Sequence, residues 1–143
     1  MHSYRQATLS DFELTFHIKS GSIKPYVEAI WGWDEQVQLS FHTREFDPKT
    51  TQIILDDNRV IGLLSTTENA DSIYVKSILV HHSAQKNGVG TAIMTDIIQR
   101  AQVAGKRVEL QVYKVNQRAK KFYERLGFGV TGQTDLHYQM AYS

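Results

Sequence analysis

A polar loop with two glycines is the stretch of this sequence best suited to hold a phosphate. Gln85 to Gly90 follows the apolar run Ile78–Val80 and precedes apolar residues at helical spacing, so it joins a predicted strand to a predicted helix. The first turn of a helix carries unpaired N–H groups and a partial positive charge, and both attract an anion. Gly88 and Gly90 have no side chains that would keep a phosphate away.

Two familiar phosphate-binding motifs do not fit this loop. A Walker A loop needs Gly-Lys-Ser/Thr, which is not found here. A dinucleotide fingerprint needs a third glycine or alanine where this sequence has Ile93. Two alternatives stay open, namely a nucleotide-binding domain that uses the loop for another phosphate ligand, and a turn whose glycines serve only packing.

A second segment, residues 116–128, combines a helical stripe with two polar residues of interest. Apolar side chains recur at i, i+3, i+4 and i+7, and Gly127 is typical of a helix end. Asn116 is a preferred residue for the start of a helix. Tyr123 lies within the apolar stripe, where a phenol either packs in the core or acts as a weak acid.

In combination, the two segments resemble the GNAT N-acetyltransferases. The first matches as Gln85-x-x-Gly88-x-Gly90, and the second as Asn116-x-x-Ala119 followed by Tyr123 and Gly127-Phe128. The resemblance runs from Arg5-Gln6-Ala7-Thr8 to the last predicted strand. It implies an acetyl-CoA-dependent N-acetyltransferase in which an amine attacks the thioester directly, without a covalent enzyme intermediate. The alternative in the same fold is a module that binds acyl-CoA without turnover.

The resemblance also implies which residues contact the cofactor. Backbone groups near Leu79 and Val80 would pair with the pantetheine arm of acetyl-CoA, since a strand edge that opens away from its neighbour offers N–H and C=O groups. The pyrophosphate would lie on the loop, where Gln85 replaces a common arginine and Lys86 either adds charge or is simply solvated. Asn116 would bond the pantetheine arm or cap its helix. The whole cofactor set is Leu79, Val80, Gln85, Lys86, Asn87, Gly88, Val89, Gly90 and Asn116.

Tyr123 is the expected acid, because the family's tyrosine at this place returns a proton to the departing thiolate. The general base is not given by the resemblance, since Lys76 and Ser77 stand where many relatives carry a glutamate. Glu28 and His137 are the main candidates, with Asp34 and Glu35 as others. Each of these is equally readable as a solvated surface group.

We expect Glu28 at the rim of an acceptor cavity, beside a helix face whose apolar residues recur one turn apart and would face inward. Those neighbours are Tyr26, Ile30 and Trp33, and Trp31 belongs to the same aromatic stretch. These rings are either a substrate wall or ordinary core packing.

Composition narrows the function further. The chain has 143 residues, a formal net charge of +1 and no cysteine. The near-neutral charge implies neither a nucleic-acid nor a membrane partner, and the missing cysteine excludes disulfides, thiolate metal sites and a cysteine nucleophile. We therefore expect a cytoplasmic enzyme without a metal, acting on a small-molecule or peptide amine, with a homodimer as one assembly left open.

The pattern of elements predicts one domain over residues 1–143 with the α/β GNAT fold. That fold has a mixed, mostly antiparallel sheet of about seven strands, splayed between strands 4 and 5, with helices on both faces. Strands are expected at 3–7, 52–55, 60–65, 72–80, 107–113, 128–133 and 136–142. Helices are expected from Asp11 to Gly21, from Lys24 to Trp31, and over 34–46, 88–104 and 116–126. Ser10 and Glu13 form a predicted capping box, and Val37 and Phe41 are expected to face inward.

Overall fold

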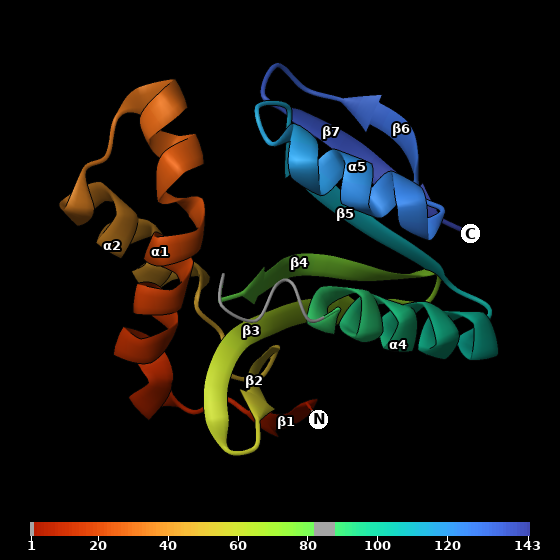
Figure 1. Ribbon diagram of the computed structural model, residues 1–143, viewed down its shortest axis with the longest axis horizontal. Helices are drawn as coiled ribbons and strands as arrows, with labels where there is room; N and C mark the ends of the chain where they lie inside the picture. Colours follow the sequence, from red (N-terminus) through yellow and green to blue (C-terminus); the bar gives the residue numbers. More distant parts are fainter. Residues whose placement is uncertain (1, 82–87) are drawn as a thin grey trace. The chain divides into compact units, whose positions relative to one another are not determined.

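A computed structural model describes residues 2–81 and 88–143 (Figure 1). Its elements, in chain order, are β1 (His2–Gln6), η1 (Leu9–Asp11), α1 (Phe12–Trp31), α2 (Glu35–Glu45), β2 (Thr51–Asp56), β3 (Arg59–Glu68), β4 (Ser72–Val80), α4 (Val89–Ala104), β5 (Arg107–Tyr113), α5 (Gln117–Leu126), β6 (Gly129–Gln133) and β7 (His137–Tyr142).

The strands form a seven-stranded sheet in the order β1-β2-β3-β4-β5-β7-β6. The pairs β1–β2, β2–β3, β5–β7 and β6–β7 are antiparallel, whereas β4 and β5 are parallel. The mixed, mostly antiparallel α/β fold is therefore confirmed. The parallel ladder joins Ser72–Val75 to Arg107–Leu110 and ends there, although both strands continue.

The chain divides into two compact units, and residues of β3 and of β4 are shared out between them. The first consists of Met1–Ser65 and Ser77–Val89, and the second of Thr66–Lys76 and Gly90–Ser143. The first unit thus contains α1 and α2 with the first strands, and the second contains α4 and α5 with the last strands. Each has its own buried side chains.

The core of the first unit is built by the hairpin of β2 and β3. Its fully or nearly fully buried side chains include Ile53, Ile54, Ile61, Leu63 and Leu64. Asp57 and Asn58 both have positive φ, as a tight hairpin turn between right-twisted strands requires. The hairpin buries mainly β-branched and leucine side chains, which suits a sheet covered by helices.

Gly62 in β3 lets the end of β4 approach the strand closely. A Cβ atom at Gly62 would overlap the carbonyl oxygen of Leu79 and would lie 3.1 Å from the Cα of Val80. Just beyond, the N–H of His81 donates to the carbonyl of Ile61 at 2.6 Å. No side chain other than hydrogen fits at position 62 without moving one strand.

Helix α1 begins with an ion pair rather than with the predicted Ser10–Glu13 capping box. The Asp11 carboxylate accepts the N–H of Thr8 at 2.9 Å and binds both guanidinium nitrogens of Arg5 at 2.8 and 2.9 Å. These bonds, led by that from Arg5, lower the pKa of Asp11 to about 2. The pair joins β1 to the start of α1, and the capping box is formed by Thr8 and Asp11, two residues earlier than predicted.

The prediction that Gly21 ends the first helix was also wrong. Helix α1 is one element of 20 residues with both Gly21 and Pro25 inside it. Glycine costs a helix about 1 kcal/mol relative to alanine, and proline removes one N–H donor, here the one that would reach Gly21. Burial of Thr15 and Val27 along the helix holds it together across both residues.

Helix α2 buries a different side chain from those predicted. Val37 and Phe41 were expected inward, but their exposed fractions are 44% and 41%, whereas His42 is only 3% exposed. Asp34 caps this helix by accepting the N–H groups of Gln36 and Val37, as its predicted start requires. The extent of α2 was therefore predicted and its inward face was not.

The second unit packs α4 and α5 with β5, β7 and β6. Its buried side chains alternate along β5 (Val108, Leu110, Val112) and recur at helical spacing along α4 (Ile93, Met94, Ile97, Ile98, Ala101). Gly127 ends α5 in the left-handed conformation with φ 107°, beside the ring of Tyr142. The bounds of β4 and β5 match the prediction residue for residue.

We predict opposite stability effects for alanine at two glycines of the first unit. Gly62→Ala should lower the free energy of unfolding by about 1–3 kcal/mol, because it forces two strands apart. Gly21→Ala should raise it by about 0.5–1 kcal/mol, because a Cβ there meets nothing within 4 Å and alanine favours a helix. Denaturant unfolding measures both. A Gly62→Ala protein as stable as wild type would contradict the close approach.

Candidate functional site

The start of α4 carries the described part of the predicted phosphate loop. Gln85, Lys86 and Asn87 lie outside the described residues. Gly88 precedes the helix with φ 73°, a conformation that side chains with a Cβ rarely adopt. Val89 and Gly90 form the first turn of a 16-residue helix, whose leading N–H groups suit an anion.

Gly88 and Gly90 differ in whether the structure requires a glycine at their positions. Gly88 is required by its backbone angle, and a Cβ there would meet nothing within 4 Å. Gly90 has no such angle, and a Cβ there would lie 3.5 Å from the Cζ atom of Phe122, which is ordinary contact. The ring of Phe122 from α5 therefore extends close to the first turn of α4 within the second unit.

Asn116 caps helix α5. Its side-chain oxygen accepts the N–H of Ala119 at 3.1 Å, which confirms one of its two predicted roles. The amide nitrogen of the same side chain is a separate donor that capping does not use. Both roles are therefore compatible in one residue.

Tyr123 lies on the buried side of α5, with an exposed fraction of 8%. Its ring contacts Phe122 and Phe128 edge-on, with centroid distances of 5.2 and 5.6 Å. Burial raises the pKa of the phenol to about 12, so the hydroxyl keeps its proton at neutral pH. The burial that packs the Tyr123 ring in the core also raises the pKa of its hydroxyl.

His137 begins β7 directly opposite Tyr113, the last residue of β5. The two rings lie 4.4 Å apart, and the hydroxyl of Thr134 is 3.5 Å from Nδ1 of His137. Burial lowers the pKa of His137, so its imidazole is neutral at physiological pH and available as a base.

Glu28 lies on α1 in the first unit with half of its side chain exposed. Its carboxylate is 3.8 Å from the ammonium of Lys24, and the same ammonium lies 5.7 Å from the centre of the Trp33 ring. The predicted inward neighbours Tyr26, Ile30 and Trp33 are half-buried. The geometry thus places Glu28 on a solvated helix face beside a lysine.

Leu79 is half-buried and Val80 is buried at the end of β4, where Gly62 faces the Leu79 carbonyl. Gly62 was not among the predicted site residues. An isolated glycine inside a strand pattern was the available signal, because it often marks a close backbone approach.

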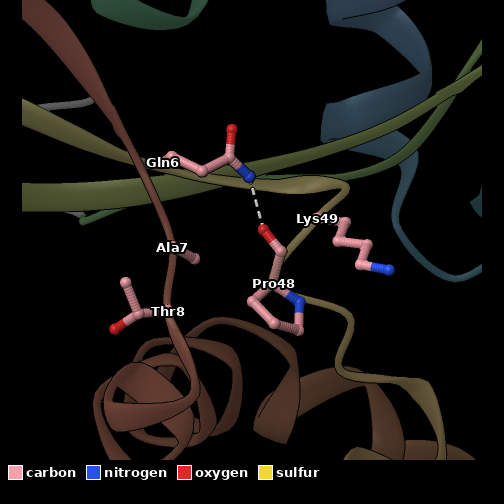
Figure 2. Close-up of a pocket in the computed structure, with 5 residues that line it drawn as sticks. All are labelled: Gln6, Ala7, Thr8, Pro48 and Lys49. Carbon is pink, nitrogen blue, oxygen red and sulfur yellow. Dashed lines mark hydrogen bonds between the residues drawn. The ribbon is translucent and has the colours of Figure 1, made fainter.

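The first unit also has a shallow hollow of about 390 Å³ between the end of β1 and the segment before β2 (Figure 2). It is lined by Gln6, Ala7, Thr8, Pro48 and Lys49, and the Gln6 amide donates to the carbonyl of Pro48. None of the predicted site residues lines it. Among residues 2–81 and 88–143, no group of histidines and carboxylates suits a metal ion.

Comparison with known proteins identifies the family. The sequence model of the Acetyltransferase (GNAT) family matches residues 12–128, which include both signature segments. The chain belongs to the GNAT acetyltransferase family. This acetyltransferase is therefore an acyltransferase of the class that uses acetyl-CoA as donor and amines as acceptors.

Solved structures support the same fold. One is the PaiA N-acetyltransferase from Thermoplasma acidophilum in complex with coenzyme A, with TM-score 0.79, 15% identity and coverage of 99% of this chain and 98% of that chain. Another is the ribosomal-protein-S18-alanine N-acetyltransferase from Escherichia coli, with TM-score 0.70, 18% identity and coverage of 99% and 92%. A third is Arabidopsis thaliana Naa50 in complex with the bisubstrate analogue CoA-Ac-MVNAL, with TM-score 0.62, 14% identity and coverage of 99% and 98%.

The two roles of Asn116 are separable by substitution. Asn116→Asp keeps a good capping oxygen but loses the amide donor, so we expect near-native stability with weaker CoA binding. Asn116→Ala should weaken CoA binding as well and also lower stability by about 1 kcal/mol. Thermal unfolding and calorimetric titration with CoA measure the two effects. Native CoA affinity in a stable Asn116→Asp protein would leave the residue as a cap alone.

Proposed function

We propose that this chain transfers an acetyl group from acetyl-CoA to a primary amine by direct attack, with Tyr123 and Asn116 at the cofactor. The observation that carries the proposal is the proximity of α5 to the start of α4, where a Cβ atom at Gly90 would lie 3.5 Å from Cζ of Phe122. This proximity supports a site in which the start of α4 holds an anion and α5 contributes Asn116 and Tyr123. Both units, residues 1–143, then belong to one acetyltransferase domain.

The described residues fit the cofactor they would hold. Gly88 and Gly90 leave the N–H groups at the start of α4 open to a pyrophosphate. The other proposed pyrophosphate contacts are the adjoining residues Gln85, Lys86, Asn87 and Val89. Near Leu79 and Val80, backbone groups of β4 would pair with the pantetheine arm. The end of the β4–β5 ladder at Val75 and Leu110 supports this, because β4 continues for five more residues without that ladder. Acetyl-CoA supplies the activated acyl group.

Tyr123 acts in this proposal mainly as a hydrogen-bond donor to the leaving sulfur. Its pKa of about 12 lies above that of an ordinary thiol, so complete proton transfer to a thiolate would be uphill. Donation of a hydrogen bond stabilises the developing charge without that cost. Complete protonation of the thiolate can follow with water.

His137 is our first candidate for the general base because of its protonation state, and Glu28 is the second. Neutral imidazole accepts a proton at physiological pH, and burial keeps His137 in that form. Glu28, paired with Lys24 on an exposed face, would act on a cationic amine by attraction or through water. The acceptor is a small-molecule or peptide amine, supported by what the family acts on.

A cytoplasmic location belongs to the same proposal, supported by the absence of cysteine. No helix within the described ranges is both long and apolar enough to cross a membrane. The near-neutral charge supports a protein without a nucleic-acid partner. The assembly left open is a homodimer, which light scattering of the purified protein would distinguish from a monomer.

The phosphate site is tested by substitutions at two glycines. Gly88→Val should weaken CoA binding by more than tenfold, or about 1.4 kcal/mol, because valine resists the left-handed backbone that precedes α4. Gly105→Val is the matched control, since Gly105 also has a positive φ of 69° and open space around its Cβ but follows the other end of α4, and it should bind CoA within a few-fold of wild type. Calorimetry with CoA measures both. Unchanged affinity in folded Gly88→Val would refute the loop assignment.

The role of Tyr123 is tested by removing one oxygen. Tyr123→Phe keeps the ring and its contacts with Phe122 and Phe128, so fold and CoA affinity should persist. Turnover should fall on the order of 10²-fold if the hydroxyl assists departure of the thiol. Steady-state rates with an accepted amine measure this. Equal turnover of the variant and the wild type, with chemistry limiting the rate, would leave Tyr123 with a packing role only. If the wild type turned over none of a broad panel of amines, the non-catalytic acyl-CoA-binding module would be favoured.

A further inference from the structure

His42 is a buried histidine between the two helices of the first unit that the proposed reaction does not use. Figure 1 shows α2 beside α1. The side chain of His42, on α2, has an exposed fraction of only 3%. Its Nε2 atom lies 3.0 Å from the carbonyl of Phe12 and 3.0 Å from the hydroxyl of Thr15, both on α1.

These partners determine which ring nitrogen carries the proton. A carbonyl only accepts, so Nε2 must donate to Phe12. The Thr15 hydroxyl can donate to the carbonyl of Asp11 at 2.8 Å and accept from Nε2 at the same time. The neutral ring is therefore protonated on Nε2, and Nδ1 carries a lone pair.

Nδ1 is buried and has no hydrogen-bond partner among the described residues. Three phenylalanine rings surround the imidazole, with centroid distances of 4.6 Å to Phe12, 5.5 Å to Phe16 and 5.3 Å to Phe46. A second proton would create an N–H donor on Nδ1 with no acceptor, in an apolar surrounding that disfavours charge.

The charged groups near His42 belong to both helices and to β1. Lys19 on α1 disfavours a charged imidazole and Glu45 on α2 favours it, but the two are paired with each other at 3.1 Å. At the start of α1, the carboxylate of Asp11 is held by Arg5 of β1. Burial is the largest influence, and it lowers the pKa of His42 in the folded state.

We propose that His42 is a pH-sensitive latch that holds α2 on α1 only while it is neutral. In the closed form the ring excludes the second proton, whereas in the open form water solvates it and the ring titrates near its ordinary pKa of about 6.5. The contribution of His42 to the stability of the closed form is thus fully present above that pH, and it decreases as the pH drops below it. If the 24–46 segment lines the acceptor side, acid would also alter acceptor binding, a consequence that rests on the proposed function.

Hydrogen exchange of the intact protein tests the latch. Between pH 7.5 and pH 5.0, protection of α2 amides, corrected for intrinsic exchange, should fall on the order of tenfold, the size expected for one buried N–H without an acceptor. Amides of β5 should keep their protection. His42→Phe retains a ring without a titrating nitrogen, so its α2 protection should not depend on pH. His17→Gln, at an exposed histidine of α1, should behave like wild type.

Two results would overturn the proposal. One is wild-type α2 protection that does not change across this range, and the other is the same decline in His42→Phe. If His42→Phe does not fold, nitrogen NMR of the wild-type imidazole decides the question. The latch requires the Nε2–H tautomer and a titration midpoint below 6.5, and either an Nδ1–H ring or a midpoint at or above 6.5 would refute it.

Discussion

The approach of the Leu79 carbonyl to Gly62 is the constraint on which the centre of this fold depends. Strand β4 pairs with β3 on one side and, through a short parallel ladder, with β5 on the other. Its last residues can stay beside β3 only if position 62 has no side chain. That requirement holds the backbone at Leu79 and Val80, where the proposed cofactor contacts lie, against β3.

Strands and the longest apolar stripes were predictable because a single local pattern decided each of them. Alternation along β5 and the helical spacing of α4 match one buried face each, so their bounds followed from sequence. The α1 region was different, since Gly21 and Pro25 are local signals for a break. Tertiary burial of Thr15 and Val27 outweighs those signals, and no local rule contains that burial.

The inward face of α2 was mispredicted for a related reason. Hydrophobicity favours Val37 and Phe41 over His42, but the inward position must also satisfy the carbonyl of Phe12 and the hydroxyl of Thr15. Imidazole provides a donor and an aromatic ring in one side chain, which valine and phenylalanine do not. The decisive partner lies about 30 residues earlier in the chain, beyond any pattern within α2.

For the site, the sequence identified residue types more reliably than residue roles. Asn116 and Tyr123 were each assigned two competing readings, a structural one and a functional one. The structure shows the capping bond of Asn116 and the aromatic packing of Tyr123, yet neither excludes chemistry. Capping occupies only the amide oxygen of Asn116, and the burial that packs Tyr123 raises the pKa of its phenol from the ordinary value of about 10 to about 12. For both residues, the structural contact and the proposed chemistry use the same side chain without conflict. Showing that Asn116 caps a helix, or that Tyr123 packs in the core, therefore does not decide whether it also acts on the cofactor.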